Sequence, residues 1–157
     1  MIIVDSGHQV QSGVVPYHDT YKSLVDQELV RAPQATIQAT WKRAGDKVQF
    51  VVQIKNQSGV SLSFAQNKAA VHAIVYEDKE VGVTSRYVRS AVFQNINTSL
   101  APGASATFTL NTPDLLGVDW NKLHFLALVD YQPVSSPAYD MLQAAVAQPA
   151  LSDIPAD

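Results

Sequence analysis

Two neighbouring segments of the chain alternate apolar and polar residues with a period of two. They are residues 35–41 (ATIQATW) and residues 48–54 (VQFVVQI), and the sequence AGDK lies between them at residues 44–47. A period of two places apolar side chains on one face of a β-strand and polar side chains on the other. The Gly-Asp pair is a hairpin signal. The pattern therefore predicts an antiparallel hairpin with one buried face and one wet face.

Two later segments are apolar at both odd and even positions. They are residues 69–78 (AAVHAIVYED) and residues 122–132 (KLHFLALVDYQ). A strand with apolar residues on both sides is typical of the interior of a sheet. We therefore expect these segments, around Ile74 and Leu126, to take central positions.

Three further segments complete the pattern. Residues 86–94 (RYVRSAVFQ) are more polar, and residues 105–112 (SATFTLNT) follow a Pro-Gly turn. Residues 138–147 (AYDMLQAAVA) fit either a helix or a strand, and we choose a strand that forms a hairpin with residues 122–132. Seven strand-like segments separated by turn signals predict an all-β fold, an antiparallel sandwich of two sheets.

The first 32 residues follow another pattern. The run MIIV predicts a short strand, followed by a second one, and residues 17–31 carry apolar side chains at the spacings of an amphipathic helix that Pro33 ends. We therefore divide the chain into an N-terminal appendage (residues 1–32), a β-sandwich (residues 33–148) and a flexible tail (residues 149–157).

Composition narrows the class of protein. Only 16% of the residues are charged, against a usual value of about 25%, which favours a β-rich exported protein. The net charge is −3 and the basic residues are scattered, so we expect no nucleic-acid partner. No apolar run approaches the ~20 residues of a membrane span, and the N-terminus lacks the features of a signal peptide. The chain has no cysteine, which excludes disulfides and thiolate metal sites.

Five short motifs, taken in order, resemble a known family. They are QIKNQSG, VHAIVYEDKEV, YVRSAV, LAPGASATFTL and the pair KLHFLALVDY…MLQAAV, and the similarity around them covers residues 34–146. The series is similar to bacterial immunoglobulin-like domains, and among them to those that follow a thioredoxin-like domain in exported outer-membrane and lipoprotein-type proteins. The resemblance implies an immunoglobulin-like antiparallel β-sandwich of about seven strands and an extracytoplasmic location: periplasm, cell surface or secreted.

Residues 1–31 resemble the last strands and the final helix of a thioredoxin fold, with MIIVD as a core strand. The Cys-x-x-Cys half of that fold is missing, so no redox activity is implied. The resemblance implies that the appendage is the remnant of a thioredoxin-like domain. It also implies that the partner is another protein or a preceding domain of the same polypeptide. An exposed apolar helix face would also favour a homodimer.

Two histidines are the candidates for a metal site. His72 and His124 lie in the two central segments, at positions that place both side chains on the same face of one sheet. If they approach each other near Asp78 or Asp130, the two imidazoles can hold a divalent metal. The dense ligand spacing of zinc motifs is missing, so we expect each ring to have a structural role, bonded to a neighbouring group.

Aromatic residues offer a candidate ligand site. Trp41, Trp120 and Tyr131 can form a platform that stacks on sugars. Core packing is the competing interpretation and is favoured for Trp120, which precedes a central strand. For Trp41 the two interpretations stay open.

Charged residues near the centre of the sequence offer two more candidates. Arg86, Tyr87 and Arg89 form the densest basic-aromatic cluster, which either recognises an acidic partner or decorates a solvated strand face. The alternation of Tyr87 and Arg89 with Val88 and Ser90 favours the solvated face. The carboxylates in the sequence EDKE, at residues 77–80, can serve acid–base chemistry or calcium, but a solvated strand end explains them. The sequence DSGH, at residues 5–8, places Asp, Ser and His side by side, where they cannot orient toward one carbonyl.

These observations lead to one expectation and two alternatives. We expect a noncatalytic structural or interaction module of an exported or cell-envelope bacterial protein, without catalytic residues or cofactors. The first alternative is a carbohydrate-binding or other ligand-binding sandwich that uses exposed aromatic residues. The second is a metal-binding or enzymatic site around His72 and His124.

Overall fold

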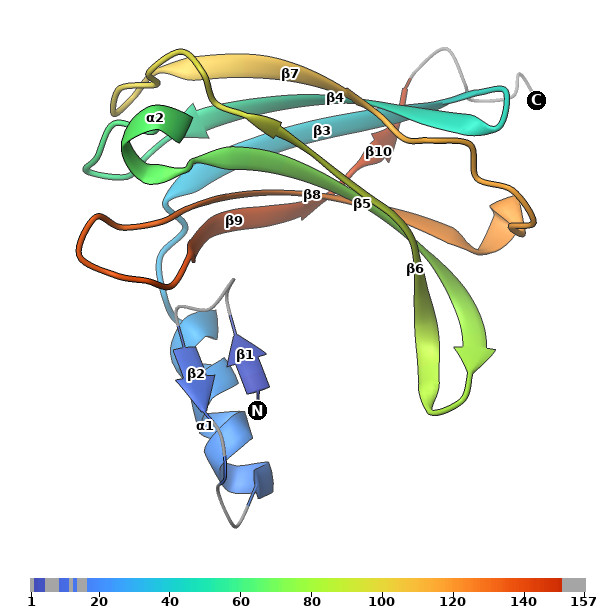
Figure 1. Cartoon of the computed structure of the whole chain (residues 1–157), viewed down its shortest axis with the longest axis horizontal. Coiled ribbons are helices and arrows are strands. Elements are labelled where there is room, and N and C mark those ends of the chain that lie inside the picture. Colours follow the sequence, from blue (N-terminus) through green and yellow to red (C-terminus); the bar gives the residue numbers. More distant parts are fainter. Residues whose placement is uncertain (1, 5–8, 12, 14–16, 151–157) are drawn as a thin grey trace.

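The alternating segments form the first of two sheets that pack face to face (Figure 1). The computed structural model describes residues 2–4, 9–11, 13 and 17–150. Strands β3 (Ala35–Ala44) and β4 (Lys47–Asn56) are joined by the predicted hairpin turn, where Gly45 has a φ of 65°. With β7 (Ser105–Asn111) and β10 (Gln148–Pro149) they make a sheet of order β10-β3-β4-β7.

The second sheet contains the two strands that are apolar on both faces. Its order is β6 (Thr84–Asn95), β5 (Ala70–Val81), β8 (Leu123–Tyr131) and β9 (Asp140–Val146). The prediction that the segments around Ile74 and Leu126 are central is confirmed, since β5 and β8 are the two inner strands. The choice of a strand for residues 138–147 is also confirmed, because β9 pairs antiparallel with β8. All seven predicted strands are present, so the two-sheet all-β fold class is confirmed.

The core lies between the two sheets and is built from alternate residues of each strand. Its largest fully buried side chains include Phe50, Ile54, Leu62 and Ile96. Asn56, also fully buried, donates from Nδ2 to the carbonyl oxygens of Val60 and Leu100. A buried amide is stable only when its hydrogen bonds are made, so Asn56 ties the loop after β4 to the core.

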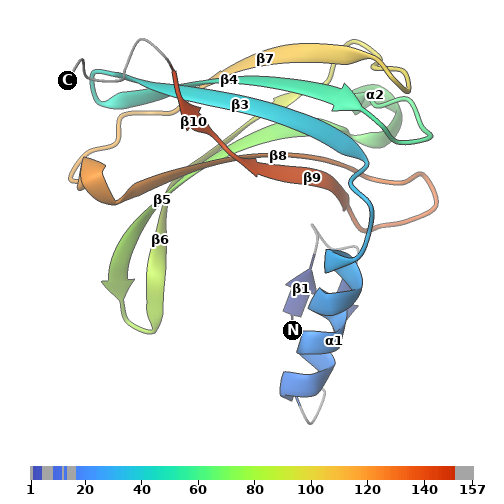
Figure 2. The ribbon, with the colours of Figure 1, turned by 180° about the vertical axis from the view of Figure 1, so that it is seen from behind.

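The N-terminal segment forms a hairpin and a helix that lie apart from the sandwich (Figure 1). Strands β1 (Ile2–Val4) and β2 (Gln9–Gln11) pair antiparallel, and α1 is Tyr17–Leu29. Figures 1 and 2 show α1 on the side of the molecule that carries the second sheet. Met1 and residues 5–8, which include the DSGH sequence, lie outside the described residues.

The C-terminal boundary differs from the prediction. Residues 148 and 149 form β10, which pairs in parallel with Thr40 and Trp41 of β3, and Ala150 N–H donates to the Trp41 carbonyl over 2.8 Å. The chain therefore crosses from the second sheet to the first, and the sandwich extends through residue 150 instead of ending at 148. The rest of the predicted tail, residues 151–157, lies outside the described residues.

Two short helical segments complete the fold. They are α2 (Phe64–Asn67), before β5, and the 3-10 turn η2 (Trp120–Lys122), before β8. Among the described residues, no helix combines the length and apolar character needed to cross a bilayer.

Candidate interaction surface

The outer faces of the two sheets differ in chemistry. On the first sheet, the side chains that point away from the core are mostly polar and exposed, including Thr36, Gln38, Thr40, Gln53, Thr107 and Thr109. The second sheet presents apolar residues at the equivalent positions, which we call the apolar outer face. Its members are Ile74, Val88, Ala91, Phe93, Leu126, Leu128, Ala144 and Val146.

The strand register explains why these residues share one face. Ile74 lies opposite Ala91 on one side and Leu126 on the other, and Leu126 lies opposite Val146. The residues at the edges of the face are open to solvent: Val88 is 57% exposed, Val146 63% and Phe93 65%. An exposed, contiguous apolar surface of this kind is typical of a binding site.

Two projections flank the apolar outer face. Strand β8 pairs with β5 only as far as Glu77, so the end of the β5–β6 hairpin, residues 78–86, continues as an unsupported arm. Figures 1 and 2 show this hairpin arm and helix α1 on the same side of the sandwich as the second sheet, at opposite ends of it.

The two candidate metal ligands lie on this face but do not meet. His72 pairs with Leu128 in the sheet register and His124 with Tyr76, so the two histidines are four positions apart along the strands. At the strand rise this is about 13 Å, too far for one metal ion. The hypothesis that the imidazoles approach each other is wrong, because strand parity places them on one face but the register separates them. Within the described part of the chain, no group of three or more metal-ligating side chains is assembled.

Each histidine bonds instead to one of the carboxylates considered for the metal site. His72 Nε2 lies 3.0 Å from Asp130 Oδ1, and His124 Nε2 lies 2.7 Å from Asp78 Oδ2. The His124 ring also stacks on Tyr76, with centroids 4.8 Å apart. The two pairs give the apolar outer face a polar group at each end.

The predicted solvated strand end contains a buried ion pair. Glu77 accepts from Arg89 Nε at 2.6 Å and from the Asp119 backbone N–H at 2.9 Å. The side chains are only 5% and 16% exposed. These contacts lower the pKa of Glu77, the Asp119 hydrogen bond being the largest cause and Arg89 a further one, while burial opposes them. The expectation that Glu77 and Arg89 are solvated is therefore wrong.

A β-bulge explains the position of Arg89. Val75 pairs with Ser90 and Tyr76 with Val88, so Arg89 is the extra residue between two regular pairs. A bulge re-aims a side chain relative to strict alternation. Arg89 therefore reaches Glu77 on the core side, although the sequence pattern places it with the outward residues.

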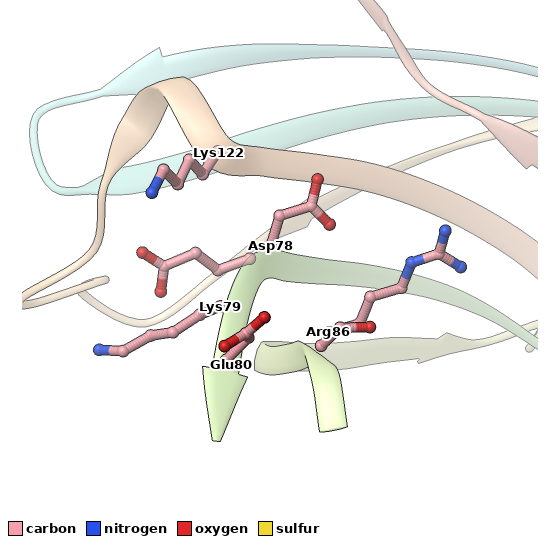
Figure 3. Close-up of a pocket in the computed structure, with 7 residues that line it drawn as sticks. Asp78, Lys79, Glu80, Arg86 and Lys122 are labelled. Atoms are coloured by element: carbon pink, nitrogen blue, oxygen red, sulfur yellow. The ribbon is translucent and has the colours of Figure 1, made fainter. Parts of the chain in front are cut away.

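The rest of the charged cluster lies around the hairpin arm. Figure 3 shows Lys79 and Lys122 extending to one side of the arm, while Asp78 and Arg86 extend to the other. Arg86 lies over the Tyr76 ring at 5.8 Å, and the Arg89 guanidinium lies 4.9 Å from the Tyr87 ring. The charged side chains labelled in Figure 3 line one depression and extend to different sides of the arm.

For Trp41, whose two interpretations were open, the structure shows core packing. Trp41 lies on the core side of β3 and stacks on Phe125, with ring centroids 3.9 Å apart. Trp120 packs against the core, and the Arg43 guanidinium covers its ring at 3.9 Å. Tyr131 also packs against the core. All three rings are thus occupied by intramolecular contacts.

Other aromatic residues gather around His72. Phe64, Phe93 and Tyr139 line one depression together with His72 and Asp130. These three rings come from α2, β6 and the loop before β9, and sequence reasoning did not single them out. The one signal for Phe93 was its place in a polar strand at an outward position, opposite His72.

Comparison with solved structures finds several chains that are similar to this one. It is similar to a domain of the outer membrane lipoprotein Omp28 from Porphyromonas gingivalis, with 18% identity and a TM-score of 0.46 over 76% of this chain and 93% of that one. It is also similar to DesR, a beta-glucosidase from Streptomyces venezuelae, with 16% identity and a TM-score of 0.37 over 78% of this chain and 17% of that one. Beta-D-glucoside glucohydrolase from Trichoderma reesei has 16% identity and a TM-score of 0.39 over 93% of this chain and 25% of its own. No protein-family model and no curated protein matches the sequence.

Proposed function

We propose that the chain is a noncatalytic interaction module of an exported or cell-envelope bacterial protein, and that the apolar outer face is its docking surface for a folded protein domain. The observation that carries the proposal is the contrast between the two sheets. The first sheet has a polar outer face, and the second exposes Val88, Phe93 and Val146.

Exposure of the apolar outer face to water costs free energy, and docking of a partner removes that cost. A strand that is apolar on both sides normally has both faces covered, as β5 and β8 would be if a second body lay on them. While the face is in contact with water, the protein lacks the stabilisation that burial of apolar surface provides, about 25 cal/mol per Å². A partner that covers the face would recover it.

The surroundings of the face define the chemistry of the partner. The centre is uncharged, while the ends hold the His72–Asp130 and His124–Asp78 pairs together with Arg86. We infer a partner with an apolar centre and a rim that carries charges of both signs, the usual anatomy of a protein interface. Helix α1, which exposes Leu29, lies on the same side of the molecule and would extend the contact.

The extracytoplasmic location rests on the resemblance of the sequence motifs to exported bacterial immunoglobulin-like domains. It predicts that protease added to intact spheroplasts of the native bacterium degrades the protein that carries this chain. Protection equal to that of a cytoplasmic marker would contradict the proposed location.

Site-specific photo-crosslinking tests the docking surface. A photoreactive phenylalanine analogue replaces Val88 or Val146 in the native polypeptide, and Val51, on the outer face of the first sheet, is the control at 40% exposure. We expect both positions on the apolar outer face to crosslink to the same protein domain, and Val51 to give no such product. Val146→Lys should abolish the crosslink from position 88.

The outcomes distinguish the possible occupants. A crosslink to a neighbouring domain of the same polypeptide or to one separate protein supports the proposal, and the mass of the product tells the two apart. A crosslink to a second copy of the chain would replace the proposed partner with a homodimer. Equal products from Val51 and Val88 would show that the apolar outer face is not a docking surface.

A further inference from the structure

A second feature of the molecule is the depression at one end of the apolar outer face. It is open to solvent, encloses about 570 Å³, and lies where β5 and β6 meet α2 and the loop before β9. It is lined by Phe64, Lys68, Ala70, His72, Phe93, Asn95, Asp130 and Tyr139. This volume is in the range of small-molecule sites.

Aromatic rings form the apolar part of the depression. Phe93 is 65% exposed, and its ring lies 5.8 Å from the His72 ring at an interplanar angle of 34°. Phe64 and Tyr139 line the same space and are also exposed. Exposed rings that converge on one space offer stacking surfaces for a ligand with a flat apolar face.

Polar groups form the rest of the lining. The Asp130 side chain is only 10% exposed, and His72 occupies its Oδ1, while no hydrogen bond from the described residues reaches Oδ2. The Oδ1 of Asn95 is buried and has no partner among those residues. Asp130 Oδ2 can therefore accept a hydrogen bond that a ligand donates.

Lys68 adds a donor in a constrained position. It follows α2 with a φ of 52°, the one described residue other than glycine in the left-handed region, and its Nζ lies 4.9 Å from the Phe64 ring. This is the left-handed conformation of a helix C-cap, and the Lys68 backbone N–H donates to the Phe64 carbonyl. The ammonium group supplies a hydrogen-bond donor and makes the depression unfavourable for a cationic ligand.

We propose that this depression binds a neutral pyranose unit of a carbohydrate. A pyranose presents a C–H face that can stack on Phe93, and its hydroxyl groups both donate and accept. They can donate to Asp130 and accept from Lys68, a combination that a purely cationic or purely anionic ligand does not offer. This inference goes beyond the proposed protein docking. The site shares Phe93 with the apolar outer face and the His72–Asp130 pair with its rim, and it adds Phe64, Lys68 and Tyr139.

Ligand-observed NMR with the purified chain tests the site. Saturation-transfer difference spectra are recorded with D-glucose, D-galactose, D-mannose and N-acetyl-D-glucosamine, and with L-arginine as the cationic probe. We expect signals from at least one sugar, strongest at the C–H protons of one ring face, with a Kd of about 1 mM for a monosaccharide.

Variants connect the signal to the depression. Phe93→Ala and Asp130→Asn should each weaken binding about 10-fold or more, while Tyr87→Ala, which removes an exposed ring from the same strand, should leave it unchanged. Melting curves confirm that each variant is folded, and Tyr139→Ala provides a second test if Asp130→Asn unfolds.

Val146→Lys, which abolishes the proposed docking, should still bind sugar, so the two proposals fail separately. Absence of signal from every sugar, binding of arginine instead, or sugar binding unaffected by Phe93→Ala would overturn the proposal.

Discussion

At the scale of single residues, Glu77 and Arg89 were assigned to the surface from the sequence, but they form a buried ion pair in the structure. The pair joins β5 to β6, and Glu77 also binds the Asp119 backbone N–H in the loop before β8. Three segments therefore depend on one carboxylate. Removing one partner of a buried pair leaves the other charge uncompensated, which costs more than the pair contributes.

The pH dependence of this pair has a defined sign. The pKa of Glu77 lies below its ordinary value of 4.5 in the folded protein. Ionised Glu77 therefore stabilises the folded protein. Its contribution to the free energy of unfolding is present above about pH 4.5 and is lost as the pH falls through the folded-state pKa. We expect Glu77→Gln to lower the Tm by several degrees at pH 7 and by progressively less below pH 4.5.

Differential scanning calorimetry between pH 7 and pH 3 measures this effect. Glu80→Gln, which changes an exposed carboxylate of the same hairpin arm, is the matched control and should leave the Tm unchanged. A Tm difference between wild type and Glu77→Gln that is the same at every pH would show that the charge of Glu77 is unimportant.

At the scale of elements, the attachment of α1 depends on contacts at its C-terminal end. Arg31, just after the helix, donates to Asp140 Oδ1 over 2.6 Å and to the Met141 carbonyl over 2.7 Å, both at the start of β9. The two charged side chains are 22% and 10% exposed. A charge-assisted, partly buried contact of this kind fixes the helix relative to the second sheet.

Arg31→Ala should release the helix from the sandwich. We expect the contact between α1 and the sandwich to lose about 2 kcal/mol of stability, the range of hydrogen bonds to charged groups. Proteolysis between α1 and β3 and amide exchange in α1 should both become faster. Lys22→Ala removes an exposed pair with Asp26 within the helix and should cost only ~0.4 kcal/mol. If both variants are cleaved at the wild-type rate, Arg31 does not anchor α1.

At the scale of the whole molecule, the chain closes the sandwich by crossing from one sheet to the other at its C-terminal end. Strand β9 belongs to the second sheet, and β10 pairs with β3 of the first, beside Trp41. This pairing covers part of the β3 edge, and an uncovered edge is prone to association. The short strand therefore stabilises the edge of the first sheet.

Truncation tests this role. Deleting residues 148–157 should lower the free energy of unfolding by about 1–2 kcal/mol, because about one kcal/mol net is lost per hydrogen bond, and should alter Trp41 fluorescence. Deleting only residues 151–157 gives the reference protein, against which the loss caused by removing residues 148–150 is measured. Equal stability of the two truncated proteins would mean that β10 contributes nothing.

Local pattern predicted most of the architecture but little of the candidate site. The period of two depends only on neighbours in sequence, so it indicated the strands, the central positions of β5 and β8, and the shared face of His72 and His124. Cross-strand register and bulges depend on partners far away in the chain. The four-residue offset between the histidines and the inward turn of Arg89 were therefore not predictable from the pattern.

The sequence by itself determined that this protein is a sandwich of two β-sheets, because alternation specifies which side of each strand avoids water. Only the tertiary structure decided how the second apolar side of β5 and β8 is used. It showed that this side remains open, flanked by α1 and the hairpin arm, and it brought Phe64, Phe93 and Tyr139 together around Asp130. A periodic pattern specifies burial for one strand at a time, whereas a surface or a site arises only when several strands are packed in register.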